Sequence, residues 1–312
     1  MVTPLYNKEQ EISRTIASIL TQTMTDFEWI VVDDGSTDQG TEQIKVLQDS
    51  RVSLIAQTNS GVSVARNRGI AKARAEWIAF LDADDTWLPD FLETVLCLIH
   101  SYPSCMLVGT GYLLCEKNGF KYKPLIKGLP SPVMWEGVLP NYFGIAAQFD
   151  PPFCSSSVAV QKKAILAIGG FPKGVHNGED ILTWARLATQ YDIAYSAKHL
   201  AHYYLPPHNA YRLTYLDTDQ VGDGLNSLLI KITGSQKIYL RRYIAKWHQI
   251  RASNFLSTGQ PGAVKSILKA IRFGGQKKRL LIYAIIACLP RSLSVIVMKN
   301  LRGITLSCRK KD

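Results

Sequence analysis

The sequence predicts an α/β fold: a mostly parallel sheet flanked by helices, followed by a basic helical C-terminal region. Over the first hundred residues, short β-branched runs alternate with stretches of helical periodicity, and strands joined by helices of this length pair in parallel with both faces covered. The charge distribution then sets the end of the chain apart. Residues 241–312 hold 16 Lys and Arg and one acidic residue, whereas residues 1–240 hold 20 Lys and Arg and 24 Asp and Glu.

The first half of the chain contains three expected strands and three expected helices. The strands are FEWIVV (27–32), RVSLIAQ (51–57) and WIAFLD (77–82). The second helix is expected at 59–74, and Pro89 opens the third. The first helix is expected to start from an Asn7 N-cap, and its apolar face carries Ile12, Ile16, Ile19 and Leu20. The apolar face of the third helix carries Phe91, Leu92, Val95, Leu96 and Ile99.

The second half returns to order after an irregular, Gly/Pro-rich stretch between about 103 and 150 that contains one clear strand, MLVGTGYLL (106–114). The later elements are expected as strand 154–160, helix 162–168, a turn at GGF (169–171), helix 179–189 and strand 192–197. Beyond about residue 240 the basic helical region begins.

Cysteine usage and hydropathy exclude several classes of protein. The six cysteines form no C-x-x-C pair and no His-linked spacing, so we expect reduced thiols in the cytoplasm and neither a disulfide framework nor a zinc site. The N-terminus carries no charged-then-apolar leader, which argues against secretion. The longest apolar run, residues 280–289, stops at Pro290 and is too short to cross a bilayer.

Acidic residues follow two of the expected strands. Asp33 and Asp34 end one, and Asp82, Asp84 and Asp85 end another, where ligands of parallel sheets bind. Asp82 and Asp84 point the same way about 7 Å apart and can bracket a hard cation, Mg²⁺ or Mn²⁺ rather than Zn²⁺. The alternative is a solvated turn that caps the next helix. VVDDGSTD has the same two interpretations, a turn or an acceptor for a ribose or base.

A third acidic pair opens a later helix. Glu179 and Asp180 follow the GGF turn and a loop of small and polar residues. Acids in a first helical turn complement the helix dipole, or one of them serves as a general base for a hydroxyl. The chain has no G-x-G-x-x-G after a strand and no G-x-x-x-x-G-K-[ST], so neither a dinucleotide cofactor nor a P-loop is indicated.

Taken together, six motifs resemble the inverting nucleotide-sugar glycosyltransferases of family 2. Their order and spacing match those of the family's motifs. The six are PLYN (4–7), VVDDGSTD (31–38), NSGVSVARNRG (59–69), FLDADD (80–85), GGF (169–171) and GED (178–180). The resemblance covers about residues 2–205 and implies the GT-A fold, a Rossmann-like and mostly parallel sheet flanked by helices. It divides the chain into a glycosyltransferase domain (1–205, nucleotide half about 1–100, acceptor half about 101–205), a connecting segment (206–240) and the basic region (241–312).

The resemblance also implies how a donor is held. Asp34, with Asp33, would read the uracil or ribose of a nucleotide sugar near Pro4 and Tyr6. Arg66 would face the nucleotide from its helix.

The acidic motif FLDADD would hold the diphosphate. Asp82 and Asp84 would form the D-x-D pair that grips the ribose and a divalent cation, Mn²⁺ or Mg²⁺, with Asp85 also on the donor side. His208 stands where some relatives supply an extra metal or phosphate ligand; the alternative is a structural histidine in a Tyr/Pro-rich segment.

On the acceptor side the resemblance implies that Asp180 is the catalytic base, supported by Glu179.

The sequence departs from the family pattern in two further ways. The family's first strand normally precedes the P-x-Y-N segment, but only three residues precede Pro4 here, and a clipped start would weaken the nucleotide pocket and the sheet. No Q-x-x-R-W follows the E-D pair at the spacing of processive members, the nearest match being QKKRL (276–280), which indicates transfer of a single sugar.

The expected function is therefore transfer of one sugar, UDP-linked as a first guess, to a hydroxyl of a glycan or lipid-linked acceptor in surface polysaccharide or glycolipid assembly. The alternative is a non-catalytic nucleotide-sugar or membrane-binding protein of the same fold. A nucleotidyltransferase would need a basic Gly-rich loop near the N-terminus, which is absent.

The basic C-terminal segment has two possible structural interpretations. Residues 271–312 interleave apolar clusters with Lys and Arg, as in helices that lie on anionic membranes, here the inner face of the cell membrane; the alternative is a helical cap with a solvated face. Nucleic-acid binding is not expected, because aromatics are few and the body of the chain is acidic.

Overall fold

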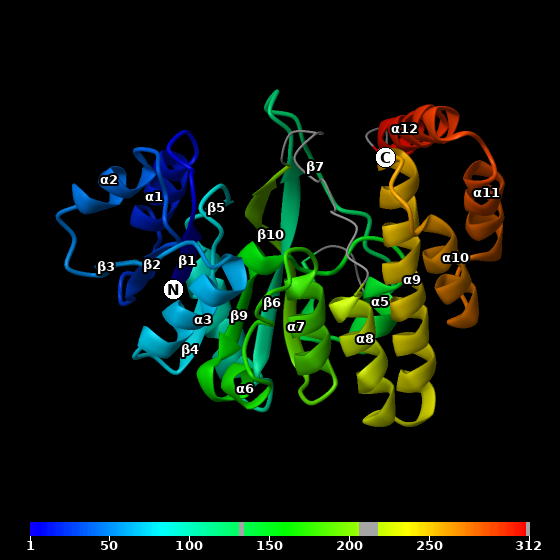
Figure 1. Ribbon diagram of the computed structural model, residues 1–312. Helices are drawn as coiled ribbons and strands as arrows, with labels where there is room; N and C mark the ends of the chain where they lie inside the picture. Colours follow the sequence, from blue (N-terminus) through cyan, green and yellow to red (C-terminus); the bar gives the residue numbers. More distant parts are fainter. Residues whose placement is uncertain (131–133, 206–217, 310–312) are drawn as a thin grey trace. The chain divides into compact units, whose positions relative to one another are not determined.

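The computed structural model describes residues 1–130, 134–205 and 218–309, with side chains to residue 302 (Figure 1). The chain forms two compact units. The first contains Met1–Pro124, Leu129–Tyr142 and Pro151–Leu205. The second contains Leu125–Gly128, Phe143–Asp150 and Pro206–Asp312, so two short segments from the middle of the chain belong to the C-terminal unit.

The first unit is built on one sheet with strand order β3-β2-β1-β4-β9-β6-β10-β5, with β7 on β6 and β8 on β10. The neighbours β3, β2, β1 and β4 run parallel, as do β6 and β10, while β9 lies antiparallel between β4 and β6. The strands are β1 (Val2–Leu5), β2 (Trp29–Asp33), β3 (Val52–Ala56), β4 (Trp77–Phe80), β5 (Thr86–Trp87), β6 (Leu107–Cys115), β7 (Lys121–Tyr122), β8 (Glu136–Val138), β9 (Val158–Gln161) and β10 (Ile193–Tyr204). The predicted α/β architecture with a mostly parallel sheet is confirmed.

Strand β1 is short but central. All four of its residues pair with β2, and Val2 also pairs with Phe80 of β4. Val2 and Leu5 are fully buried. Gly69 lies against Val2 so closely that a Cβ there would come within 2.4 Å of Val2 Cγ1. The first strand therefore forms despite the short segment before Pro4. The absence of a side chain at Gly69 lets helix α3 (Val62–Lys72) pack directly against this strand.

The helices of the first unit are α1 (Ile12–Leu20), α2 (Gly40–Lys45), α3 (Val62–Lys72), α4 (Phe91–Ser101), α6 (Lys162–Ala167) and α7 (Glu179–Ala188); α5 (Tyr142–Ala146) begins in this unit and continues into the second. A 3₁₀ turn, Ser155–Ser157, precedes β9 where the sequence predicted extended chain. Apolar faces lie inward as predicted for Ile12, Ile16 and Ile19.

Two local predictions about α1 are wrong. Asn7 is not an N-cap: α1 begins at Ile12 behind Glu11, and Asn7 has a φ of 50° with its side chain accepting from Thr37 N–H at 2.8 Å. Asn tolerates this left-handed conformation, which favours a turn over a cap. Leu20, in the last turn of α1, is exposed rather than buried.

In α4 the helix starts at Phe91 after Asp90, not at Pro89. Leu98 is buried where the predicted face placed Leu96, which is exposed. A small rotation of the buried face about the helix axis accounts for the exchange, since the two residues lie on opposite sides of Val95 and Ile99.

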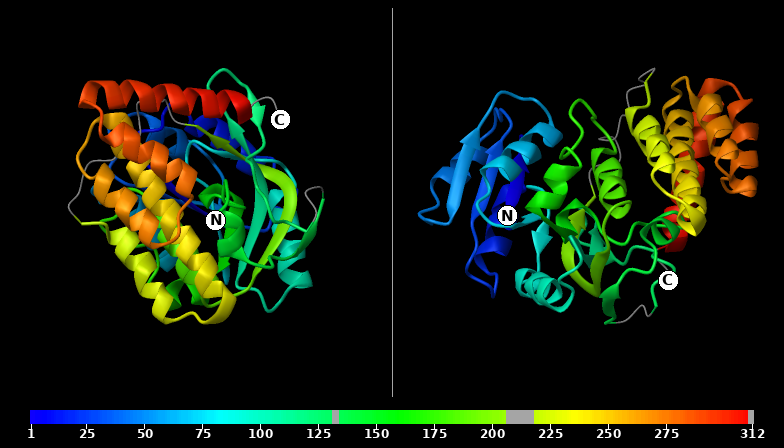
Figure 2. Two further views of the ribbon diagram at one scale, coloured as in Figure 1. Left: turned by 90° about the vertical axis from the view of Figure 1, so that its right-hand side faces the viewer. Right: turned by 90° about the horizontal axis from the view of Figure 1, so that it is seen from below.

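The second unit is helical, as predicted for the C-terminal region. It contains α8 (Gln220–Ser227), η2 (Leu228–Ile230), α9 (Gly234–Thr258), α10 (Ala263–Arg272), α11 (Lys277–Ala287) and α12 (Arg291–Arg309). Helices therefore already occupy residues 220–240, within the expected connecting segment. The long α9 packs against α10, α11 and α12, shown in yellow, orange and red in Figures 1 and 2. Over the described ranges, no helix has both the length and the apolar character needed to span a bilayer.

Candidate active site

The carboxyl ends of β1, β2 and β4 meet at one edge of the sheet, because these neighbours run parallel. Tyr6 follows β1 and is about half exposed (47%), while Pro4 lies within β1 opposite Val32. Asp33 ends β2 and Asp34 follows it, and Asp82, Asp84 and Asp85 follow β4. The structure thus brings the two predicted acidic clusters of the first hundred residues to the same edge.

Asp34 is buried and organises the loop between β3 and α3. Its Oδ1 accepts from Gln57 Nε2 at 2.7 Å and Ser60 N–H at 2.8 Å, and its Oδ2 accepts from Gly61 N–H at 2.8 Å. Asp33 Oδ1 accepts from Ser36 N–H at 2.9 Å. A carboxylate that accepts several backbone N–H groups holds a loop rigidly. Both residues therefore shape the wall of the predicted nucleotide pocket.

The D-x-D pair carries two basic partners. Arg66, 2% exposed on α3, donates from NH2 to Asp82 Oδ1 at 2.6 Å. Lys8 Nζ donates to Asp84 Oδ2 at 2.6 Å. Burial alone would lower the pKa of Lys8, but the adjacent Asp84 carboxylate outweighs it and raises that pKa. Two side-chain cations thus offset the repulsion among the clustered carboxylates.

Asp85 lies beneath this pair with no exposed surface. Its Oδ1 accepts from Tyr204 N–H at 2.8 Å, and its Oδ2 accepts from Ser156 Oγ at 2.5 Å. Burial, followed by the charges of Asp84 and Asp82, raises the pKa of Asp85 well above its usual range. The sequence analysis placed Asp85 on the donor side; its complete burial instead favours a role in supporting the loop.

Two residues of α1 also hold the acidic loop. Arg14 donates to the Asp84 carbonyl oxygen from Nε at 3.2 Å and from Nη2 at 2.7 Å, and its guanidinium lies 3.9 Å from the Tyr204 ring centre. Thr15 Oγ1 is 3.0 Å from Ala83 O and 2.8 Å from Asp85 O. Sequence reasoning did not single out Lys8, Arg14, Thr15 or Ser156. Nothing local in the sequence marks them, since each lies about 70 or more residues from its partner.

Arg66 joins the third acidic pair to the first site. Its NH1 donates to Glu179 Oε1 at 3.1 Å while its NH2 holds Asp82, so one guanidinium spans two motifs 97 positions apart. Burial, opposed by Asp82 and Glu179, leaves the pKa of Arg66 raised, so the cation is permanent. Burial and then the Asp180 charge raise the pKa of Glu179 to about 7 against the pull of Arg66.

Asp180 lies in the same electrostatic environment. Burial raises its pKa, while Arg66 and the N–H of Ile181 pull it down and Asp82 raises it further. Its Oδ1 accepts from Ile181 N–H at 2.7 Å. Gly178, with a φ of 81°, turns the chain into α7 so that both acids lie in the first helical turn. The arrangement combines a carboxylate with a raised pKa and a fixed cation, which is a favourable setting for proton transfer.

The GGF turn is fastened to α3 by Asn67. Asn67 Nδ2 donates to Phe171 O at 2.8 Å, and Phe171 N–H donates to Asn67 Oδ1 at 2.8 Å. Gly170 has a φ of 70°, and a Cβ there would come within 2.4 Å of Asn67 Oδ1. Phe171 then packs edge-on against Phe80 and Trp184, with ring centres 5.3 and 5.5 Å apart. This contact fixes the start of the loop that leads to Glu179.

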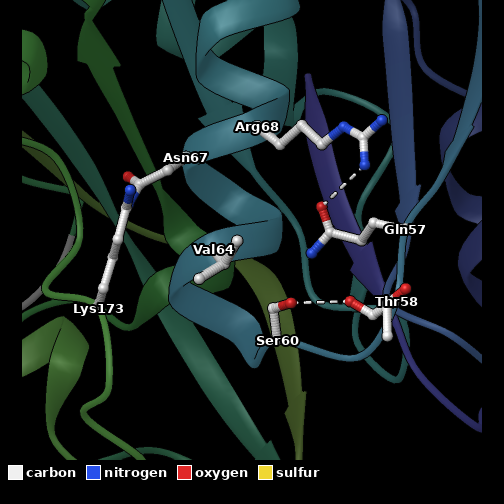
Figure 3. A pocket seen from close by; sticks show the side chains of 7 residues that line it. All are labelled: Gln57, Thr58, Ser60, Val64, Asn67, Arg68 and Lys173. Carbon is white, nitrogen blue, oxygen red and sulfur yellow. Dashed lines mark hydrogen bonds between the residues drawn. The ribbon is translucent and has the colours of Figure 1, made fainter.

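A hollow of about 460 Å³ lies beside α3 (Figure 3). Arg68 NH1 donates to Gln57 Oε1 at 3.3 Å within it, and Gln57 in turn holds Asp34. Its lining residues are Gln57, Thr58, Ser60, Val64, Asn67, Arg68 and Lys173. None of the acidic residues lines this hollow, which therefore backs the Asp34 network rather than containing the candidate site.

The chemistry of the D-x-D pair fits a divalent cation that arrives with a diphosphate. In residues 1–130, 134–205 and 218–309, no three His, Cys, Asp or Glu side chains are grouped as metal ligands. Asp82 and Asp84 each use one carboxylate oxygen to bind Arg66 or Lys8. Mg²⁺ commonly takes one or two carboxylates and completes its shell with water and substrate phosphates. His208, the remaining predicted ligand, lies outside the described residues.

Comparison with known families identifies the architecture. The model of the family described as "Glycosyl transferase family 2" matches residues 1–166, which include four of the six motifs. The chain belongs to glycosyl transferase family 2. Its first unit accordingly has the GT-A fold. The GGF and GED motifs lie just beyond the matched range.

Curated relatives resemble this family 2 chain over part of its length. Glycosyltransferase GlyA of Streptococcus pneumoniae is 36% identical over 124 residues, 39% of this chain and 18% of that protein. The putative teichuronic acid biosynthesis glycosyltransferase TuaG of Bacillus subtilis is 36% identical over 135 residues, 42% of this chain and 52% of that protein. The alignments thus span about a fifth to a half of these relatives.

Solved structures agree on the fold. S. aureus TarS (residues 1–349) in complex with UDP-GlcNAc superposes with a TM-score of 0.68 at 18% identity, covering 87% of this chain and 80% of that one. At this identity the likeness concerns the fold alone.

Proposed function

We propose that the protein is an inverting glycosyltransferase that moves a single sugar from a nucleotide-sugar donor to a hydroxyl group of a glycan or lipid-linked acceptor. One observation carries the proposal. Arg66 holds Asp82 of the D-x-D pair and Glu179 of the E-D pair at once, at 2.6 and 3.1 Å. The group that would seat the leaving diphosphate and the group that would face the acceptor therefore share one cation.

The donor is a UDP-sugar in this proposal. Pro4, Tyr6, Asp33 and Asp34 border the place for the uridine, with residues of about 1–100 forming the nucleotide half and about 101–205 the acceptor half. Support comes from the family membership and from TarS, whose structure was solved with UDP-GlcNAc. The buried Asp85 acts beneath the pocket by holding the loop of Asp82 and Asp84.

The chemistry follows from charge. The acceptor oxygen attacks the anomeric carbon opposite the nucleotide, the bond to the diphosphate breaks, and Asp180 takes the hydroxyl proton, so that configuration inverts. Glu179 restrains Arg66 and keeps the proton acceptor in place. Negative charge grows on the diphosphate, where Lys8 and Arg66 supply fixed positive charge. A Mn²⁺ or Mg²⁺ ion held by Asp82 and Asp84 would add Lewis-acid stabilisation of the same charge.

The acceptor belongs to surface polysaccharide or glycolipid assembly in this proposal, and the protein works in the cytoplasm at the inner face of the membrane. The name of TuaG, which refers to teichuronic acid biosynthesis, favours a cell-surface glycan. The absence of the Q-x-x-R-W motif favours one transfer per encounter rather than processive synthesis.

The first experiment is a thermal-shift panel of UDP-, GDP- and dTDP-sugars with and without Mn²⁺, followed by release of nucleotide from each stabilising donor. We expect stabilisation by a UDP-sugar that increases with Mn²⁺, together with slow donor hydrolysis in the absence of acceptor. Stabilisation without any hydrolysis or transfer to a glycan or lipid acceptor would favour the non-catalytic alternative. No stabilisation by any nucleotide sugar would contradict the proposed transfer and a non-catalytic nucleotide-sugar-binding role alike.

A further inference from the structure

Helices α10 and α11 expose apolar side chains that their own unit does not use. The exposed positions are Val264, Leu268 and Ile271 of α10 and Leu281, Ile282 and Ile285 of α11, each 46–64% exposed. The opposite faces of the same helices already supply the core, through Ile267 and Ala270 in α10 and Leu280, Tyr283 and Ile286 in α11. We call the six exposed positions, with the basic residues around them, the α10–α11 surface.

The spacing shows that these positions are organised. Val264, Leu268 and Ile271 recur at i, i+4 and i+7, which places them on one side of α10, and Leu281 and Ile285 are one turn apart on α11. The two helices pack against each other within the second unit. A soluble helix normally faces solvent with polar residues, so a second apolar side indicates a further partner.

Exposed cations lie on the same two helices as these apolar positions. Lys265 and Arg272 lie on α10, and Lys277, Lys278 and Arg279 open α11, all of them exposed. No Asp or Glu occurs between residues 241 and 311. A partner must therefore offer negative charge to the cations and an apolar layer to the leucines and isoleucines.

We propose that the α10–α11 surface docks on an anionic lipid bilayer. Lipid headgroups supply the negative charge and the acyl chains supply the apolar layer, which is how amphipathic basic helices bind in the membrane interface. A second copy of the chain would bring an equally basic surface and be repelled. A nucleic acid would match the charge but would gain little from Leu and Ile, since its binding sites rely on stacking aromatic residues.

The test is co-sedimentation of the full chain with vesicles, in the absence of donor and acceptor. Binding to vesicles of phosphatidylglycerol and phosphatidylcholine is compared with binding to phosphatidylcholine alone. Because no catalytic step is involved, failure of this test removes only the proposed place at the membrane and leaves the proposed sugar transfer standing, and failure of sugar transfer leaves this test intact.

Two variants test the apolar contribution and the electrostatic contribution to vesicle binding separately. Leu268→Ser with Ile285→Ser removes apolar surface and keeps every charge, and it is expected to weaken binding to anionic vesicles at least about tenfold. Lys277→Gln, Lys278→Gln and Arg279→Gln together keep the apolar positions and are expected to weaken it about a hundredfold, or roughly fivefold for each cation. Val46→Ser, at a 73% exposed position in the first unit, is the matched control and should bind as the parent does.

The proposal predicts binding that requires the anionic lipid, falls with salt and is reduced by both sets of substitutions. It is overturned if the parent chain fails to bind the anionic vesicles. It is also overturned if the serine pair binds as tightly as the parent, which would indicate a soluble polyanion, or if size-exclusion chromatography shows a dimer that the serine pair dissociates. Unchanged thermal unfolding of each variant confirms that folding is intact.

Discussion

At the scale of single residues, Arg66 is the centre of the candidate site. It is almost fully buried and holds one carboxylate from each of two distant motifs. A buried charged network is not a strong source of stability in itself, but removal of one member leaves the others buried and unpaired, which typically costs about 3–5 kcal/mol.

The first prediction follows for Arg66→Met, which keeps most of the side-chain volume. We expect the free energy of unfolding to fall by about 3 kcal/mol and sugar transfer to be lost. The matched control is Arg74→Met: Arg74 is 86% exposed in its pair with Glu28, and exposed pairs contribute about 0–1 kcal/mol. Urea unfolding checks the difference, and equal effects of the two substitutions would contradict the assigned role.

The second prediction concerns pH. A base must be deprotonated to accept a proton, and burial raises the pKa of Asp180 while the pKa of Glu179 is raised to about 7. Transfer should therefore decline at a higher pH than it would with an ordinary carboxyl group as the base. Glu179→Gln should move this decline to lower pH, because the Arg66 charge then acts more fully on Asp180. Initial rates across the acid range test it; an unmoved profile would show that the pair does not set it.

Many residues of the candidate site could be predicted from the sequence. The acidic residues could be singled out because turn-rich acidic clusters at strand ends and helix starts are visible in the sequence, and their roles stay predictions. From the sequence, a divalent cation is expected beside Asp82 and Asp84, and Arg66 is expected to face the nucleotide. The structure adds the ion pairs with Lys8 and Arg66, and the sequence could not show that pairing because it depends on which strands become neighbours.

At the scale of elements, Asn67 clamps the GGF turn, from which the loop to α7 starts. Gly169 and Gly170 both have positive φ, but only Gly170 is crowded by Asn67, and nothing lies within 4 Å of a Cβ at Gly169. A comparison of alanine substitutions at these two adjacent glycines therefore distinguishes the cost of backbone strain from the cost of a steric clash with Asn67.

The third prediction uses that difference. Gly169→Ala should cost only the strain of a left-handed alanine, about 1 kcal/mol. Gly170→Ala should cost more, because Asn67 must move, and should also reduce transfer by loosening the loop before Glu179. Combination with Asn67→Gly should recover part of the extra loss in stability. Equal losses for the two alanine variants, measured by thermal unfolding, would argue against the clamp.

Element positions were predicted best where local pattern is strong. The strands at β2, β3, β4 and β6 and the helix α7 were expected within a few residues of their observed bounds. β10 extends to Tyr204, past the expected end at 197, because β6 and β5 both offer it backbone partners. The two-residue β5 exists only through that pairing, so no local signal marks it.

At the scale of the whole molecule, the chain joins a nearly balanced first unit to a basic helical one. The second unit has its own buried polar centre at Asp219. Its Oδ1 accepts from Gly222 N–H, Trp247 Nε1 and Arg251 NH1 at 2.9, 3.1 and 3.1 Å. His248 Nδ1 lies 3.5 Å from Oδ2, and burial lowers the pKa of His248 to about 4.

The fourth prediction is that Asp219→Asn destabilises the second unit by about 3 kcal/mol, since Arg251 then loses its charged partner inside the protein. Asp223→Asn, one turn further along α8 and 71% exposed, should change stability by less than about 1 kcal/mol. Hydrogen exchange should show lost protection in α8 and α9 for the first variant, with UDP affinity retained. Lost protection throughout the sheet would mean that the two units unfold together.

The central claim is that two acidic clusters form one site with separate tasks, one for the donor and one for the acceptor proton. Calorimetric titration of UDP with Mn²⁺, paired with transfer rates, tests it in Asp180→Asn and Asp84→Asn. We expect Asp180→Asn to bind UDP like the parent and to lose transfer by about 10²–10⁴-fold, and Asp84→Asn to lose both. Transfer at the parental rate in Asp180→Asn, or an equal loss of UDP affinity in both variants, would contradict it.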